Sequence, residues 1–383
     1  MFKKVLAVTL AVCMALCFAA CGTTTQSSDS DANVIKVGAT GPLTGGAAIY
    51  GNAVKTGAEI AVEEINAKGG IQFEFNMQDD AHDAEKAVNA YNDLKDWGMQ
   101  LMMGTVTSAP AEATAAEAYS DRVFFLTPSA SSTDVISGKD NIFQMCFTDP
   151  NQGSGAAQYI YEHNMATKVG VIYKSDDNYS MGIKKTFDAK ANELGLEIAV
   201  EVAFDDSSSS DFSSQIAAMQ QAGVDLVFLP MYYTPASLIF KQAAQVGFET
   251  TWFGVDGMDG ILTLEGFDTS LAEGVILLTP YTADDASSEN KSFVEKYNEI
   301  MGEDPNQFAA DAYDCIYALY EAATKAGLTG SMSAEEMCEK MIEQFTSMTF
   351  DGLTGKNMTW AADGTVSKSP NAMIIKNGAY EGL

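Results

Sequence analysis

Two clusters of small hydroxyl side chains follow short apolar runs in the first half of the chain. The segment GTVTSAP (104–110) comes directly after the apolar residues 101–103, and TPSASST (127–133) directly after 123–126. Serines at strand ends either attack a substrate or hold a ligand. An attacking serine needs a base within hydrogen-bond reach, and the chain has only two histidines, His82 and His163. The sequence therefore favours binding over catalysis for Ser108, Ser129 and Ser131.

The position of these serines indicates what they would hold. Ligands of open α/β sheets bind beyond the carboxyl ends of the strands. A loop that leads into a helix there offers free backbone N–H groups and the positive end of the helix dipole. Hydroxyl groups add hydrogen-bond donors without adding charge. We therefore expect these loops to hold a small anion, such as a carboxylate.

An acid in the second half of the chain is the candidate counterpart. Asp256 lies in WFGVDG (252–257), where an apolar strand ends among flexible residues. It is either an ordinary helix N-cap or the partner of an ammonium group across a cleft. Together with the serine loops, the second role would recognise a zwitterion.

Other motifs that could support chemistry are weak or missing in the sequence. The chain has neither a phosphate-binding Gly-rich loop followed by Lys nor a Gly-x-Ser-x-Gly elbow. His82 lies in DDAHD, but adjacent loop residues cannot all converge on one ion, so a solvated loop is expected there. His163 is expected on a helix surface. We therefore expect no metal and no cofactor.

The elements that must position these residues alternate between strand and helix. Short continuous apolar strands separated by amphipathic helices predict parallel sheets covered on both faces, an α/β fold. Strands are expected at 35–39, 73–77, 101–103, 123–126, 169–173, 197–204, 226–229 and 251–253. Helices are expected at 50–68, 84–97, 111–120, 180–194, 212–222 and 237–246. The rhythm restarts near 147–150, which predicts two doubly wound sheets. Helices at 290–301, 308–326 and 334–345 follow, and the end is strand-like at 373–376 and at Tyr380.

The N-terminus and the net charge restrict where the protein works. Residues 1–20 read as a signal peptide, Cys21 resembles the lipidated cysteine of a bacterial lipobox, and 21–33 read as a polar tether. The net charge of −30 disfavours nucleic acid and anionic lipid, so membrane contact is expected through the lipid anchor alone. Cys146, Cys315 and Cys338 remain, and an odd number cannot pair completely. Buried free thiols are expected.

Several longer segments resemble one known family. They are IKVGATGPLTGGAAIYGNAVKTGAEIAVEEINAKGGI (35–71), QDDAHDAEKAV (78–88), the GTVTSAP and LTPSAS loops, and VDLVFLPMYYTPASLIFKQA (224–243). They are similar to substrate-binding proteins of ABC importers for branched-chain amino acids, of the leucine/isoleucine/valine type. The resemblance covers nearly all of the chain after the tether. It implies the type I periplasmic binding protein fold, with two lobes joined by three crossovers.

The resemblance also implies roles for individual residues. Ser108 and Ser131 match positions that bind the ligand carboxylate, with Ala130 between the loop serines. Ser129 matches a carbonyl that accepts from the ammonium group, and Asp256 matches the acid that faces it. The matches to positions that line the side-chain pocket are Tyr50, Val106, Tyr179, Tyr232 and Phe308.

The chain departs from this family at two places. Members from diderm bacteria pair cysteines at the positions of His82 and Thr107, and this disulfide is lost here. The loop that positions Ser108 is therefore expected to be held by packing alone. Asp256 replaces a longer glutamate, so the bound solute can differ from leucine.

These inferences combine into one expected protein. The N-terminal lobe is expected at 34–149 plus 280–355, and the C-terminal lobe at 150–279 plus 356–383. The protein is expected to be a monomeric, non-enzymatic lipoprotein outside the cytoplasm, on the outer face of the cytoplasmic membrane or in a periplasm. It would deliver an amino acid to an ABC permease and its ATPase subunits. A sensory receptor, an amide- or urea-binding protein and a serine hydrolase remain as alternatives.

Overall fold

The computed structural model describes residues 33–383. The expected signal peptide, the lipidation site Cys21 and the tether up to residue 32 lie outside these residues. Within 33–383, no helix combines the length and the apolar character that crossing a membrane requires.

The first half of the described chain builds a parallel five-stranded sheet. Its strand order is β2-β1-β3-β4-β5, and every neighbouring pair in it is parallel. The strands are β1 (Val34–Gly41), β2 (Gln72–Asp79), β3 (Leu101–Met103), β4 (Phe124–Thr127) and β5 (Ile142–Gln144). The carboxyl ends of β3 and β4 therefore lie side by side, which brings the two serine loops to one edge.

A second sheet of seven strands has the order β12-β11-β10-β9-β8-β6-β7. Strands β6 to β10 are parallel, whereas β11 pairs antiparallel with β10 and with β12. The strands are β6 (Val169–Lys174), β7 (Ile198–Phe204), β8 (Leu226–Leu229), β9 (Thr251–Gly254), β10 (Ile276–Thr279), β11 (Asn371–Lys376) and β12 (Ala379–Gly382).

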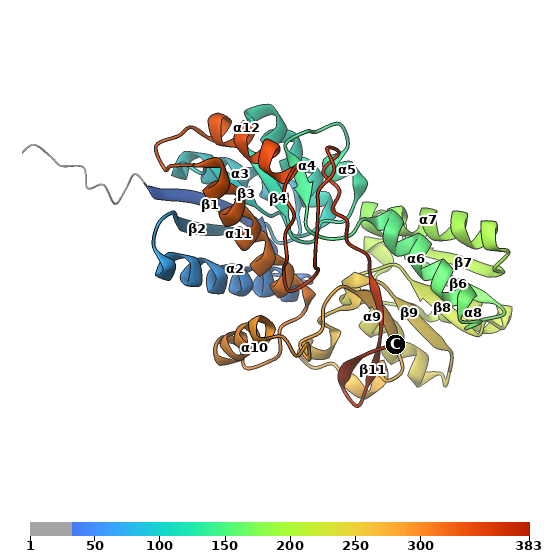
Figure 1. Cartoon of the computed structure of the whole chain (residues 1–383). Helices are drawn as coiled ribbons and strands as arrows, with labels where there is room; N and C mark the ends of the chain where they lie inside the picture. The colour runs from blue at the N-terminus through green and yellow to red at the C-terminus, as the bar shows by residue number, and fades with distance from the viewer. Residues whose placement is uncertain (1–32) are drawn as a thin grey trace, which may run out of the picture.

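Helices cover the sheets of both lobes (Figure 1). The first lobe carries α2 (Ala48–Lys68), α3 (Ala84–Trp97), α4 (Ser108–Asp121), α5 (Thr133–Ile136), α10 (Ser288–Met301), α11 (Gln307–Ala326) and α12 (Ala334–Phe345). The second lobe carries α6 (Asp149–Glu162), α7 (Asn178–Leu194), α8 (Ser213–Ala222) and α9 (Tyr233–Gln245), with short 3-10 turns η2 to η5. Helix α2 packs along α11, and α6 along α7.

The contact between α2 and α11 depends on one small residue. A Cβ atom at Gly57 would lie 2.1 Å from the carbonyl oxygen of Ala309, which is closer than van der Waals contact permits. Glycine at this position lets the two helix backbones approach closely. The contact between Gly57 and Ala309 fixes the beginning of α11, which lies at the cleft.

The chain passes between the lobes three times. It leaves the first sheet after β5, returns after β10, and finally runs from the first lobe down to β11 (Figure 1). Before the last passage, the backbone N–H of Gln144 in β5 donates to Gly364, and the indole of Trp360 donates to the Gln144 carbonyl. An antiparallel bridge pairs Trp360 with Val366, and the segment 360–366 packs on the first sheet. We therefore propose that the third crossover lies after Val366 rather than at 355.

A buried ion pair fastens the same segment to the first lobe. The ammonium group of Lys368 donates to Asp311 of α11 at 2.7 Å and to Thr354 at 2.6 Å. Both charged side chains are 2% exposed. The pair therefore anchors the chain just before it enters the second sheet.

The structure confirms the predicted α/β class and the two parallel sheets. Most predicted elements are correct to within two or three residues, while β5, α5 and β10 were not predicted and no bounds were predicted for α6. Helix α9 begins at Tyr233, four residues before the predicted start at 237. The three cysteines at 146, 315 and 338 are buried and free, as predicted.

Candidate functional site

The two serine loops hold each other in place at the carboxyl ends of β3 and β4. The hydroxyl of Thr127 donates to the carbonyl of Thr105 at 2.6 Å, and that of Ser129 to the carbonyl of Val106 at 2.7 Å. The backbone N–H of Ser132 donates to the Ser108 hydroxyl at 3.3 Å. Ser108 is the first residue of α4, so the positive end of that helix faces the same space.

A buried glutamine supports the second serine loop from behind. The side-chain amide of Gln144 donates to the carbonyls of Ala130 at 2.7 Å and Ser132 at 3.0 Å. Gln144 is the last residue of β5 and is fully buried. It therefore fixes the backbone on both sides of Ser131.

The first serine loop is not held by packing alone, and this prediction was wrong. The Nδ1 atom of His82 lies 2.9 Å from the hydroxyl of Thr107, at hydrogen-bond distance. The prediction of a solvated loop at His82 was wrong as well, because its ring stands edge-on against Tyr232, with centroids 5.5 Å apart. Burial lowers the pKa of His82. A hydrogen bond thus joins the two positions at which the resemblance implies a disulfide in members from diderm bacteria.

Asp256 lies opposite the serine loops, directly after β9. Its side chain does not cap the short η3 helix (Asp256–Met258), whose N-cap residue is Val255, so the N-cap alternative is wrong. The side chain accepts a hydrogen bond from the phenol of Tyr179, which itself accepts from the backbone of Gly257 at 2.9 Å. Asp256 is 3% exposed. Burial raises the pKa of its carboxyl to about 7, although hydrogen bonds from Tyr179 and Gln152 lower it.

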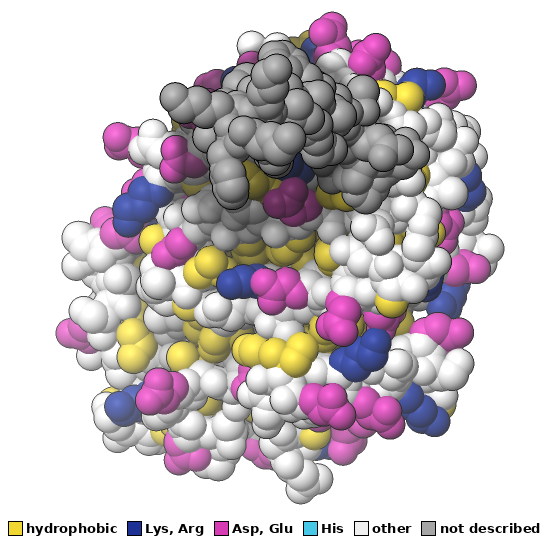
Figure 2. All heavy atoms as spheres, turned by 90° about the vertical axis from the view of Figure 1, so that its left-hand side faces the viewer, with side chains coloured by type: hydrophobic (Ala, Val, Ile, Leu, Met, Phe, Trp, Pro, Cys, Tyr) yellow, Lys and Arg dark blue, Asp and Glu magenta, His cyan; other side chains and the backbone are white. Residues whose placement is uncertain are grey.

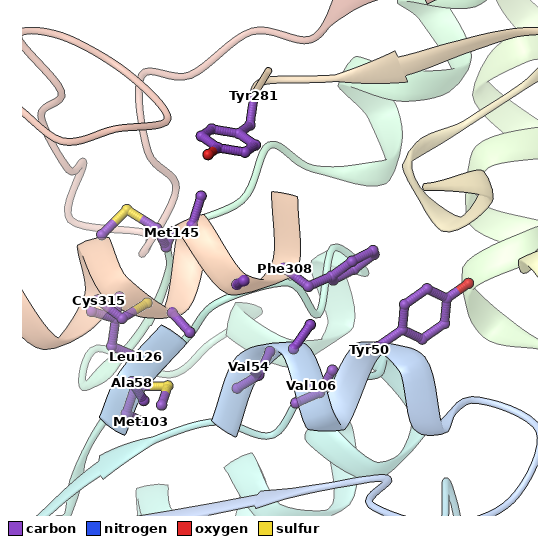
Figure 3. Close-up of a cluster of buried hydrophobic side chains, with 14 of the residues drawn as sticks. Tyr50, Val54, Ala58, Met103, Val106, Leu126, Met145, Tyr281, Phe308 and Cys315 are labelled. Atoms are coloured by element: carbon purple, nitrogen blue, oxygen red, sulfur yellow. The ribbon is translucent and has the colours of Figure 1, made fainter. Parts of the chain in front are cut away.

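Four aromatic rings line the space between the lobes. Tyr232 stacks on Tyr179 with an interplanar angle of 3° and centroids 4.5 Å apart. The ring of Tyr50 lies 5.6 Å from that of Tyr232 and 4.4 Å from that of Phe308. Figure 3 shows the Tyr50 hydroxyl pointing away from the first lobe's core, while Val106 lies on the core side of Tyr50. These residues come from both lobes and form one continuous wall.

Direct hydrogen bonds join the lobes around this wall. The Tyr50 hydroxyl donates to the carbonyl of Gly257 at 2.5 Å and accepts from the backbone of Tyr233 at 3.2 Å. At the rim, Asn178 of α7 donates to Glu112 of α4 at 2.6 Å. The structure is therefore a closed form in which the cleft excludes solvent.

Two further buried acids, Asp149 and Asp177, lie near Asp256 at the cleft. Burial raises the pKa of Asp149 well above its usual value, and it raises that of Asp177 to about 6. One oxygen of Asp149 is buried without a hydrogen-bond partner within the described residues. Such a lining favours a solute that brings a positive charge.

Most other acidic side chains are at least partly exposed on the outer surface. Figure 2 shows aspartate and glutamate side chains spread over one face of the molecule, with lysine and arginine side chains set among them. The acidic side chains on this face are therefore dispersed rather than gathered at one place.

The structure brings the ten predicted site residues into one region. Among them, Ser108, Ser131, Val106, Tyr50 and Phe308 belong to the first lobe, and Tyr179, Tyr232 and Asp256 to the second. The Ser129 hydroxyl turns to the backbone of Val106, and Ala130 is held through its carbonyl. Across residues 33–383, no group of three or more histidine, cysteine or acidic side chains is arranged to hold a metal ion.

Sequence reasoning missed several residues that build this region. Gln152 and Gln307 contact the backbone of Asp256, and Glu112 and Asn178 join the rims. They lie on helices, where glutamine and glutamate are common, so no local pattern singled them out. Only the tertiary fold places them at the cleft.

Comparisons with known proteins agree with this geometry. A family model described as periplasmic binding protein matches residues 34–379. The leucine-, isoleucine-, valine-, threonine- and alanine-binding protein of Pseudomonas aeruginosa is 28% identical over 330 residues, covering 85% of each chain.

Two solved structures are similar over almost their whole length. One is the leucine-binding protein LivK of Thermotoga maritima, with 30% identity, a TM-score of 0.82, and coverage of 91% of this chain and 97% of that one. The other is the branched-chain amino acid transporter substrate-binding protein LivJ of Streptococcus pneumoniae, in complex with isoleucine. It shows 28% identity, a TM-score of 0.82, and coverage of 91% and 98%.

Proposed function

Because the chain belongs to the periplasmic binding protein family, we propose that it captures an amino acid between its lobes and delivers it to an ABC importer. Periplasmic binding proteins work outside the cytoplasm, and they bind solutes rather than transform them. The branched-chain class of amino acid is proposed because relatives with similar sequences and folds carry that name.

One observation carries the proposal. Hydrogen-bond donors suited to a carboxylate and a buried acid suited to an ammonium group lie on opposite lobes, and the Gln152 side chain contacts both Ser131 and Asp256 at their buried interface. A zwitterion would contact both lobes at once, so its binding would favour the closed form over the open form. That difference is what a transporter can sense.

We assign the ligand-binding roles as follows. Ser108 and Ser131 bind the carboxylate, with Ala130 between the loop residues, and the Ser129 carbonyl accepts from the ammonium group. Asp256 pairs with the same ammonium group. The side-chain pocket consists of Tyr50, Val106, Tyr179, Tyr232 and Phe308.

The attachment of the protein follows from the same proposal. Lipid on Cys21 would tether a monomer to the outer face of the cytoplasmic membrane or within a periplasm, and the permease and its ATPase subunits would be its partners. Metabolic labelling with a radioactive fatty acid tests the anchor. Wild-type protein should incorporate label and Cys21→Ala should not, whereas equal labelling of both would place the lipid elsewhere.

Calorimetric titration tests the solute. Residues 34–383, which contain every described helix and strand, are unfolded and refolded to remove carried ligand and then titrated with the twenty amino acids, urea and small amides. We expect tight binding of leucine, isoleucine or valine. Binding of another amino acid would keep the zwitterion site and change the pocket assignment. Binding of urea or amides alone would overturn the amino-acid proposal.

A further inference from the structure

Two buried glutamine amides hold the backbone of Asp256. Gln152, on α6, accepts from the Asp256 N–H through Oε1 at 3.0 Å. Gln307, the first residue of α11, donates from Nε2 to the Asp256 carbonyl at 2.9 Å. Their exposed fractions are 0% and 2%. The acid is therefore held at both of its backbone polar groups.

These two amides come from different lobes. Helix α6 packs along α7 in the second lobe, whereas α11 packs along α2 in the first. The bond from Gln307 to Asp256 therefore crosses the cleft. So does the bond from Gln152 Nε2 to the Ser131 hydroxyl, at 3.3 Å. Opening the lobes would break both crossing bonds and leave only the bond between Gln152 and the Asp256 N–H.

An uncharged amide is well suited to this position. A lysine or arginine would also hold the acid, but it would neutralise the carboxylate and repel an ammonium group. The other groups that affect the Asp256 carboxyl are the Tyr179 phenol, the Gly257 N–H and the Asp311 carboxylate. Gln152 and Gln307 thus fix the acid and leave its charge for a ligand.

We propose that Gln152 and Gln307 are positioning residues that form an amide clamp on Asp256 and couple lobe closure to the placement of this acid against the ligand's ammonium group. The inference rests on the proposed function for the ligand itself. In the closed form, the clamp joins the carboxylate-binding loop, through Ser131, to the ammonium-binding acid. In the open form, the acid loses the contact from α11 that fixes its direction.

Binding measurements on matched variants test the clamp. Gln152→Met and Gln307→Met keep the size of the side chain and remove the amide. Gln215→Met is the control, because Gln215 is also buried and donates to a backbone carbonyl, that of Ala203 at 3.1 Å, away from the cleft. The probes are L-leucine and its α-keto analogue, which lacks the ammonium group.

We expect both clamp variants to bind L-leucine about 5- to 100-fold more weakly than the wild type, because a buried hydrogen bond at the ammonium anchor is lost. Binding of the keto analogue should change less, because it loses only the contribution of the crossing bonds to closure, and Gln215→Met should bind L-leucine like the wild type. The double variant should lose less than the product of the two single losses, since both amides act on one residue. Equal losses for both probes, or none, would overturn the clamp.

A ligand-free measurement separates this inference from the proposed function. Deuterium uptake at 255–258 should be faster in Gln152→Met than in the wild type and Gln215→Met, because the Asp256 N–H loses its acceptor, the Oε1 atom of Gln152. If the wild type binds no amino acid, the proposed function fails. The clamp is then tested by the exchange data alone. Unchanged exchange in Gln152→Met would overturn the clamp even if leucine binds.

Discussion

At the scale of single residues, Asp256 is a carboxylate buried among uncharged partners. The phenol of Tyr179 donates to the carboxylate, and two carboxamides hydrogen-bond to the backbone of the same residue. Burial raises the pKa of this carboxyl to about 7, so the unliganded closed form is divided between the protonated and ionised acid near neutral pH. An ammonium group would stabilise the ionised form. Ligand binding and proton binding therefore compete at this residue.

This competition predicts a pH dependence of affinity. Only the ionised acid pairs with an ammonium group, so the affinity should fall as the pH decreases through about 7, by up to about tenfold for each further pH unit. Asp256→Asn should bind about 2–5 kcal/mol more weakly at neutral pH and should lose this dependence. Calorimetry with L-leucine between about pH 5 and pH 8 measures both effects.

A surface variant provides the control for this experiment. Asp93→Asn removes the same charge from an exposed position on α3 and should leave both the affinity and its pH profile unchanged. If Asp256→Asn kept the wild-type profile, another group would be the one that titrates. A wild-type affinity independent of pH would contradict the burial argument for Asp256.

At the scale of elements, the loop after β2 and the loop after β3 are joined through His82 and Thr107. The contact places the start of α4, and with it Ser108, against the loop that precedes α3. A covalent link at the same two positions should hold the loops more firmly, because it also restricts the unfolded chain. The resemblance implies such a disulfide in family members from diderm bacteria.

We predict that His82→Cys combined with Thr107→Cys forms a disulfide under oxidising conditions. The closed loop should raise the free energy of unfolding by about 3 kcal/mol, measured by urea denaturation with and without reductant. His82→Cys alone is the control and should be less stable than the wild type, since it loses the bond to Thr107. Two free thiols persisting in the oxidised double variant would show that the side chains do not meet.

Sequence periodicity predicts most elements because the strands are short apolar runs and the helices have one apolar face. Three helix starts were missed or placed too late for a shared reason. Proline lies in the first turn of α4, α6 and α9, at Pro110, Pro150 and Pro235. Proline reads as a breaker in a sequence, yet the first turn tolerates it because its missing N–H has no partner there.

The sequence predicted only part of the candidate site. The serines and Asp256 were predicted because they follow apolar strands, where α/β ligands bind. Gln152 and Gln307 were not, because they lie near helix starts and only the packing of α6 and α11 brings them to Asp256. The role of His82 was missed for the same reason, since its partners Thr107 and Tyr232 are distant in sequence.

At the scale of the whole molecule, closure depends on contacts that no ligand supplies. Tyr50 reaches from α2 of the first lobe to Gly257 and Tyr233 of the second. The hydroxyl of Thr234 donates to the carbonyl of Gly46 at 2.6 Å beside it. These bonds contribute a fixed part of the free energy that favours the closed form over the open form. Ligand binding contributes the rest of that free energy. Weakening them should therefore weaken ligand binding even where the ligand's own contacts stay intact.

Tyr50→Phe tests this coupling, because it keeps the ring in the aromatic wall and removes the hydroxyl. We expect L-leucine to bind about 5- to 100-fold more weakly, and small-angle scattering to show a more open average shape at equal ligand concentration. Tyr91→Phe is the matched control, since Tyr91 is buried in the first lobe and bonds Asp121 at 3.0 Å within that lobe. It should lose stability but keep its affinity. If both variants bound leucine equally well, the Tyr50 hydroxyl would contribute nothing to closure, and the ligand's own contacts would have to hold the lobes together.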